Sequence, residues 1–145
     1  LLVDGVAGTS PEIGMVGGAD LAENYYSNDP LEAGQVVAID KSQTAGIKKT
    51  ETAYQKDVLG VVATSPGIVL GSNEGNAYPV ALVGRVPVKV IGKVKKGDRL
   101  VSAGNGYARS GTKAEINTWN VIGRSLENKD TLDAGTVEAV VKLNS

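Results

Sequence analysis

The chain has 145 residues, with 19 glycines, six aromatic side chains and neither cysteine nor histidine. Fifteen basic and sixteen acidic residues leave a formal net charge of −1, which offers no overall field for nucleic acid or for an anionic membrane surface. Without cysteine and histidine, a thiol nucleophile, an imidazole base and the usual ligands of zinc, haem and iron–sulfur clusters are excluded, so we expect no cofactor and no metal.

The length suits one domain with a sizeable core. No run approaches the roughly 18 apolar residues of a membrane span, and no signal peptide is visible. A start at Leu1 rather than methionine suggests a fragment of a longer protein. We interpret residues 1–18 as a linker from an upstream domain, with a short strand at Leu1 to Val3, and residues 19–145 as a single β domain.

The segment Ala19 to Asp29 predicts one helical turn. Asp20 is a possible N-cap, and Glu23 three residues later completes a pattern like a capping box. The same two carboxyls are also a candidate metal-binding or acid/base pair. Capping and solvation explain them more simply.

Short apolar runs bounded by glycine and proline predict strands over the next residues. The expected strands lie within Leu31 to Asp40, around Ile47, at Val58 to Thr64 and at Ile68 to Leu70, and Gly71 to Ala77 is an expected loop.

The central stretch is Pro79 to Asp98, in which apolar residues stand two apart, as in an extended strand. Gly84 within this run indicates a bulge or a close backbone approach. Pro87 favours an edge strand or a bulge, since it has no N–H for a ladder hydrogen bond.

Further strands are predicted on both sides of Gly104-Asn105-Gly106, a sequence typical of a type I′ hairpin. Trp119 to Ile122 and Thr136 to Leu143 are the last two expected strands. About ten short strands with at most one short helix predict an all-β fold, either β-clip-like or a distorted barrel or sandwich.

The sequence contains a possible internal repeat. Gly34 and Gly60 are 26 positions apart, and so are Gly97 and Gly123, each pair within similar surroundings. Leu132 to Gly135 resembles the first turn of each unit once more. Two alternatives stay open: a duplicated module that forms a pseudo-symmetric barrel, or a chance match of common turn sequences.

Three groups of side chains are binding candidates. Asn128, Asp130 and Asp133 have the spacing of a calcium loop but lack the glycine and the distal glutamate of an EF-hand. Four lysines indicate a solvated strand edge, and five tyrosines indicate either a sugar-binding platform or, more simply, core and interface contacts. The lysines are Lys89, Lys93, Lys95 and Lys96, and the tyrosines are Tyr25, Tyr26, Tyr54, Tyr78 and Tyr107.

Three segments resemble a known family: Asp20-Leu-Ala-Glu23, VLGVVATSPG at 58–67 and PVALVGRVPVKV at 79–90. They are similar to a β domain near the C-terminal end of phage tail-fibre and appendage proteins and of related bacterial surface proteins, beside an autoproteolytic intramolecular chaperone of the G2 type. The second half of the chain also resembles β-clip decoration proteins of phage heads.

The resemblance implies a structural or attachment module of a phage-type tail fibre or bacterial surface fibre, located on the virion or the cell surface. Its implied partners are two further copies in a homotrimer, neighbouring fibre domains and a cell-surface glycan, with no nucleic acid and no membrane insertion. It transfers no catalytic residue to this chain, so we expect no enzyme activity. The alternatives are a fragment of an autoproteolytic tail-appendage protein, with Asn144-Ser145 near a processing point, a head decoration protein, and a carbohydrate-binding module.

Overall fold

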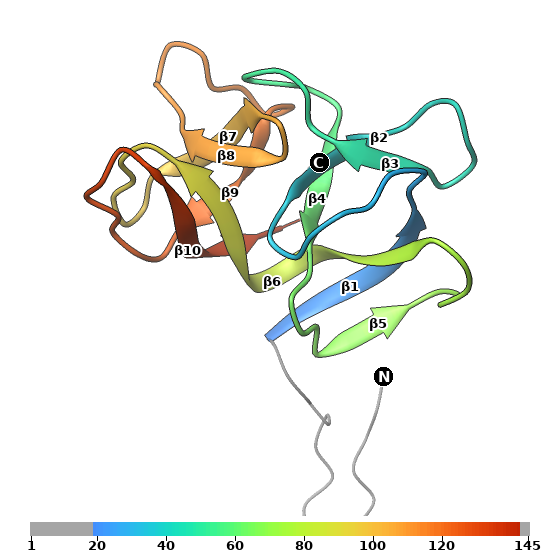
Figure 1. The fold of residues 1–145 in the computed structure, drawn as a ribbon. Coiled ribbons are helices and arrows are strands. Elements are labelled where there is room, and N and C mark those ends of the chain that lie inside the picture. The colour runs from blue at the N-terminus through green and yellow to red at the C-terminus, as the bar shows by residue number, and fades with distance from the viewer. Residues whose placement is uncertain (1–18, 143–145) are drawn as a thin grey trace, which may run out of the picture.

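The computed structural model describes residues 19–142, and the linker and the strand expected before Ala19 lie outside these residues. The described chain is all-β (Figure 1). Its strands are β1 (Ala19–Tyr26), β2 (Val36–Ile39), β3 (Ile47–Lys49), β4 (Val58–Val62), β5 (Ile68–Leu70), β6 (Ala77–Ile91), β7 (Arg99–Gly104), β8 (Tyr107–Ser110), β9 (Val121–Ser125) and β10 (Ala134–Val141).

The helical turn expected at Ala19 to Asp29 is wrong, because this segment forms β1. Asp20, Ala22 and Asn24 are buried in alternation with more exposed neighbours, which is the period of a strand. β1 pairs with β6 along its whole length and with β5 on its other side. These long-range ladders outweigh a local capping pattern of two carboxyls.

The strand predicted in the central stretch is the 15-residue β6, and it is not an edge strand. Gly84 is a close-approach site, since a Cβ there would lie 2.4 Å from the carbonyl oxygen of Ala19 and φ is +111°. The bulge falls at Leu82, opposite the register shift in β1. Pro87 pairs with Glu138 of β10 and lies between the part of β6 that pairs with β1 and the part that pairs with β8, so its missing N–H interrupts no ladder on that side.

Towards the C-terminus, the hairpin forms as expected, with positive φ at Asn105 and Gly106 and β8 as the return strand. Trp119 does not begin a strand. It lies in the turn before β9 and is 64% exposed.

Two five-stranded rings share β6. The first barrel consists of β1, the N-terminal half of β6, β4, β2 and β3, and a parallel bridge between Tyr26 and Gly46 closes it. The second barrel consists of the C-terminal half of β6, β8, β7, β9 and β10, and the β10–β6 ladder closes it. The all-β class and the barrel alternative are therefore confirmed, with the two barrels side by side in Figure 1.

The two barrels repeat each other in register, which supports the duplicated-module alternative. Val37 pairs with Gly60 in the first barrel, and Leu100 pairs with Gly123, 63 positions later, in the second. The next pair along each ladder shows the same register shift. Gly34 and Gly97 have nearly the same positive φ, +86° and +88°. The prediction of a third copy of this turn is wrong, because Gly135 lies inside β10.

The β7–β8 hairpin joins the barrels. The N–H of Val36 donates to the carbonyl oxygen of Gly106 at 2.8 Å, and the N–H of Tyr54 donates to the carbonyl oxygen of Ser102 at 2.8 Å. The Ser102 hydroxyl donates to the carbonyl oxygen of Thr52. This pairing buries the hairpin against the first barrel.

The core has two parts. One hydrophobic cluster lies within the first barrel and contains Ile47, Val80 and the partly buried Tyr25 and Tyr78. The other combines residues of both barrels, so the second barrel and the seam share one core. That shared core includes Ala22, Val36, Val61, Ala81, Val88, Leu100, Ile122 and Val137.

Candidate functional site

The structure does not bring Asp20 and Glu23 together. Asp20 lies on the buried face of β1, whereas Glu23 lies on the opposite face and accepts a hydrogen bond from the Tyr25 hydroxyl at 2.8 Å. Side chains on opposite faces of a strand cannot share a metal ion or a proton. Burial, this hydrogen bond and the Glu23 charge raise the pKa of Tyr25 to about 12.

Asp20 is an isolated buried carboxyl at the junction of the barrels. It is 3% exposed, pairs with Gly84 in the ladder, and its Oδ2 has no hydrogen-bond partner among the described residues. Burial raises the pKa of Asp20 against the opposing effect of a backbone hydrogen bond, and the Glu138 charge adds to the increase. Asp20 therefore retains a proton to higher pH than an ordinary aspartate.

Two of the three candidate calcium ligands are engaged elsewhere. Asn128 Oδ1 accepts a hydrogen bond from the Lys96 backbone N–H at 2.8 Å, and Asp133 lies 3.6 Å from Lys129 Nζ. Within residues 19–142, no group of three or more potential acidic ligands is placed to hold a metal ion. The spacing in the sequence is thus not matched by convergence in space.

The five tyrosines lie in different places. Tyr25 and Tyr78 pair across β1 and β6 and pack on the core of the first barrel. Tyr54 lies at the seam, with the Arg109 guanidinium 5.8 Å from its ring centroid. They do not form one platform for a sugar ring.

The four lysines divide into two groups. Lys89 crosses the seam to form an ion pair with Glu32, with a 2.7 Å Nζ–Oε2 distance. This contact raises the pKa of Lys89 and lowers that of Glu32. Lys93, Lys95 and Lys96 are exposed between β6 and β7, as expected of a solvated edge.

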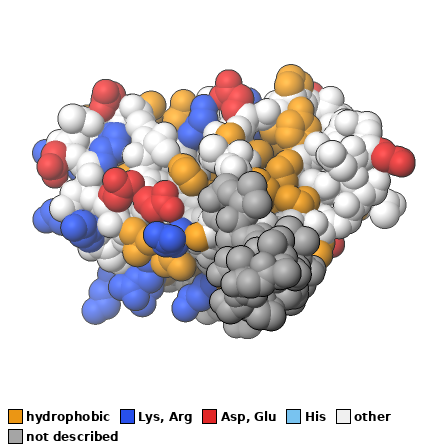
Figure 2. All heavy atoms as spheres, turned by 90° about the horizontal axis from the view of Figure 1, so that it is seen from below, with side chains coloured by type: hydrophobic (Ala, Val, Ile, Leu, Met, Phe, Trp, Pro, Cys, Tyr) orange, Lys and Arg blue, Asp and Glu red, His pale blue; other side chains and the backbone are white. Residues whose placement is uncertain are grey.

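The two barrels differ in charge. Residues 19–83 carry eight acidic and four basic side chains, whereas residues 84–142 carry six acidic and eleven basic ones. Figure 2 shows Lys and Arg side chains gathered over the side of the molecule that carries the second barrel. The overall net charge of −1 conceals this division.

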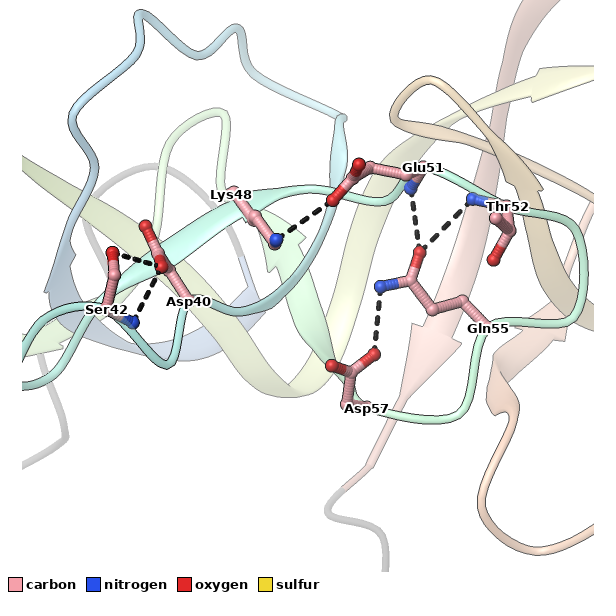
Figure 3. Close-up of polar contacts among 7 residues, drawn as sticks. All are labelled: Asp40, Ser42, Lys48, Glu51, Thr52, Gln55 and Asp57. Atoms are coloured by element: carbon pink, nitrogen blue, oxygen red, sulfur yellow. Dashed lines mark hydrogen bonds and ion pairs between the residues drawn. The ribbon is translucent and has the colours of Figure 1, made fainter.

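All four basic residues of the first barrel lie between positions 41 and 56, where acidic side chains accompany them. Figure 3 shows part of this region: Lys48 forms a 2.9 Å ion pair with Glu51, Asp40 accepts two hydrogen bonds from Ser42, and Asp57 accepts one from Gln55. Glu51, followed by Asp40 and Asp57, raises the pKa of Lys48. This polar network holds the local loops together.

The second barrel has a groove of about 540 Å³ between β7, β9, β10 and the loop before β9. Its lining includes the apolar residues Ile116, Val121 and Val140. Its charged lining residues are Arg99, Arg124 and Lys142, all exposed and all basic. The groove therefore suits an apolar surface that carries negative charge.

The residues of this groove were not singled out from the sequence. The signal that would have found them is the 63-residue offset, which aligns the buried Val36 and Val61 of the first barrel with the exposed Arg99 and Arg124 of the second. This change from apolar to basic side chains at equivalent positions indicates that the face has a different role in each barrel. It is buried in the first barrel and lines the groove in the second.

The sequence matches no protein-family model and no curated protein. Similar solved structures include two of a bacteriophage phi29 protein. The pre-mature gene product 12 of bacteriophage phi29 matches with a TM-score of 0.64 and 18% identity over 87% of this chain and 22% of that chain. The C-terminal fragment of the same gene product matches with a TM-score of 0.62 and 18% identity over 85% of this chain and 100% of the fragment.

These comparisons establish a shared fold. The chain spans about a fifth of the length of the pre-mature protein and corresponds to its C-terminal fragment as a whole. The resemblance to a β domain of phage appendage proteins, inferred above from three short segments, is confirmed at the level of the fold.

Proposed function

We propose that this chain is a structural module of a phage-type tail fibre or related surface fibre, located on the virion and acting through homotrimer assembly, with no catalysis of its own. The observation that carries the proposal is the match of nearly the whole described chain to the C-terminal fragment of phage gene product 12. A fibre module needs a stable framework and exposed surfaces for assembly and display, and the paired barrels supply both.

The chemistry of the described surface supports a structural role. The groove of the second barrel combines apolar side chains with three cations, and no carboxylate lines it, so an acid/base pair is not assembled there. The buried Asp20 lies apart from this groove, on another strand. Among residues 19–142, no helix is long and apolar enough to cross a membrane.

The assembly is tested by sedimentation equilibrium of residues 1–145 across micromolar concentrations. We expect a species of about three times the 14.9 kDa subunit mass. A single-subunit mass throughout would overturn the homotrimer.

An antibody against residues 19–142 should label an appendage of the virion in electron micrographs. Labelling of unassembled protein alone would overturn the fibre role.

A second candidate is a C-terminal segment separated from a longer fibre protein by self-cleavage. The names of the two similar structures, a pre-mature protein and a C-terminal fragment, favour it. The test is the intact mass of the full-length parent after prolonged incubation. Two fragments in a protease-free preparation would support self-cleavage, and a single undivided chain would exclude it.

A further inference from the structure

We propose that the subunits assemble head to tail, with the β5 edge of one copy docked in the basic groove of the next copy's second barrel. This inference rests on the proposed homotrimer and identifies the two surfaces that meet. The occupant of the groove is a second copy of this chain.

One edge of β5 is unpaired among the described strands. β5 pairs with β1 alone among the described strands, so its other side is an open sheet edge. Val69 and Leu70 on this strand are 44% and 46% exposed. An open edge with adjacent apolar side chains is a surface that a protein normally covers or protects with charged residues.

Acidic side chains predominate in the segments around β5. Residues 19–40 and 57–84 contain seven acidic and no basic side chains. The loop that contains the exposed Glu74 lies beside the loop with the exposed Asp29, since Ser27 and Asn76 are joined by hydrogen bonds. The ion pairs among residues 19–142 do not include Asp29 or Glu74. The β5 end is therefore apolar and carries the negative charge of Glu74, and Asp29 beside it lines the same hollow as Lys48 and Lys49.

The β5 end matches the groove, whose apolar residues and three cations have the complementary chemistry. Two β5 edges would bring like charges together in a symmetric dimer, which is unfavourable. Contact between β5 and the groove joins two different surfaces, and such a heterologous interface forms a closed ring when the rotation between copies closes.

The equivalence of the two barrels supports the same interface. The first barrel's Val36, Val61 and Ala81 are fully buried in the core that both barrels share, whereas Arg99, Arg124 and Val140 at the matching ladder positions line the open groove. In the first barrel, this face thus already serves as a docking surface, because it packs into the core shared with the second barrel. β5 itself has no counterpart in the connection from β9 to β10, so only the first barrel carries the inserted edge.

Charge reversal tests the inference by sedimentation velocity. Arg99→Glu with Lys142→Glu, or Asp29→Lys with Glu74→Lys, should weaken association at least tenfold. Arg124 is left unchanged because its Nε donates to the Gly97 carbonyl oxygen. The chain with all four substitutions should regain association. The matched control, Lys93→Glu with Lys95→Glu, changes the same charge on exposed residues outside the groove and should associate like the natural chain.

Disulfide trapping gives an independent measurement, since the natural chain has no cysteine. A mixture of Leu70→Cys and Thr118→Cys chains should form a mixed disulfide, with neither chain linking efficiently to itself. Efficient self-linking of Leu70→Cys would overturn the head-to-tail arrangement in favour of a symmetric β5 contact.

The two proposals fail separately. A trimer that tolerates both charge reversals and forms no mixed disulfide would refute the β5–groove interface and leave the homotrimer intact. A natural chain that stays a single subunit would refute the homotrimer itself, and this interface with it.

Discussion

The two barrels have the same ladders but are stabilised by different interiors. The first encloses its own cluster with Tyr25, Tyr78 and Ile47, whereas the matching positions of the second hold Val88, Val137 and Ala108. The smaller residues of the second barrel belong to the core that extends into the seam. The difference teaches that backbone register can be kept while side-chain volume is redistributed, so the second barrel depends more on its neighbour.

The largest effect is expected at Gly84, on the strand that both barrels share. Gly84→Ala would place a Cβ 2.4 Å from a carbonyl oxygen at a φ of +111°, and it should destabilise the fold by about 4 kcal/mol. Urea unfolding measures the change. The control Gly75→Ala, also at positive φ but with nothing within 4 Å, should cost about 1 kcal/mol. Equal losses in the two variants would contradict the close approach.

Two matched substitutions, Gly60→Ala and Gly123→Ala, test whether the equivalent ladders of the two barrels are also packed alike. In each case the new Cβ would meet a carbonyl oxygen of the neighbouring strand, that of Ala81 at 2.6 Å or of Val140 at 2.2 Å. We expect each variant to lose about 2–3 kcal/mol in the same urea experiment. A large loss for one and none for the other would show that the repeat in register is not a repeat in packing.

Substitution of Asp20, the buried carboxyl at the junction of the barrels, should have a smaller, pH-dependent effect on stability. Because the pKa of Asp20 is raised in the fold, the favourable contribution of its protonated form is complete below the ordinary carboxyl pKa and is lost as pH rises through the folded value. Asp20→Asn should therefore be more stable than the natural chain at pH 7 by about 1 kcal/mol. The advantage should vanish near pH 3. Thermal unfolding at the two pH values checks this, and a pH-independent difference would contradict it.

The smallest effect concerns the first barrel alone and is confined to alkaline pH. Tyr25 has a pKa raised to about 12, so the fold loses stability as pH rises from the ordinary tyrosine value near 10 towards 12. Tyr25→Phe should remove this part of the alkaline loss of stability. At pH 8, below the range of this loss, the substitution should change the stability little. The matched variant Tyr107→Phe in the second barrel serves as the control. Identical alkaline profiles for all three chains would refute the assignment.

Much of the fold follows from local patterns. Alternating valines predicted β6, and Asn105-Gly106 predicted the hairpin. The glycine spacing left a repeat and a chance match open, and the ladders of Val37 and Leu100 support the repeat. Each of these signals acts between near neighbours or through the conformational needs of glycine, which are properties of the sequence itself.

The sequence by itself determined the all-β class, the strand-rich centre and the absence of thiol and imidazole chemistry. Only the tertiary structure decided that Asp20 lies in a strand, that β6 serves two barrels, and that Arg99, Arg124 and Lys142 line one groove. The physical reason is distance along the chain: ladders and grooves join residues tens of positions apart, and no periodicity within one segment specifies which segments will meet.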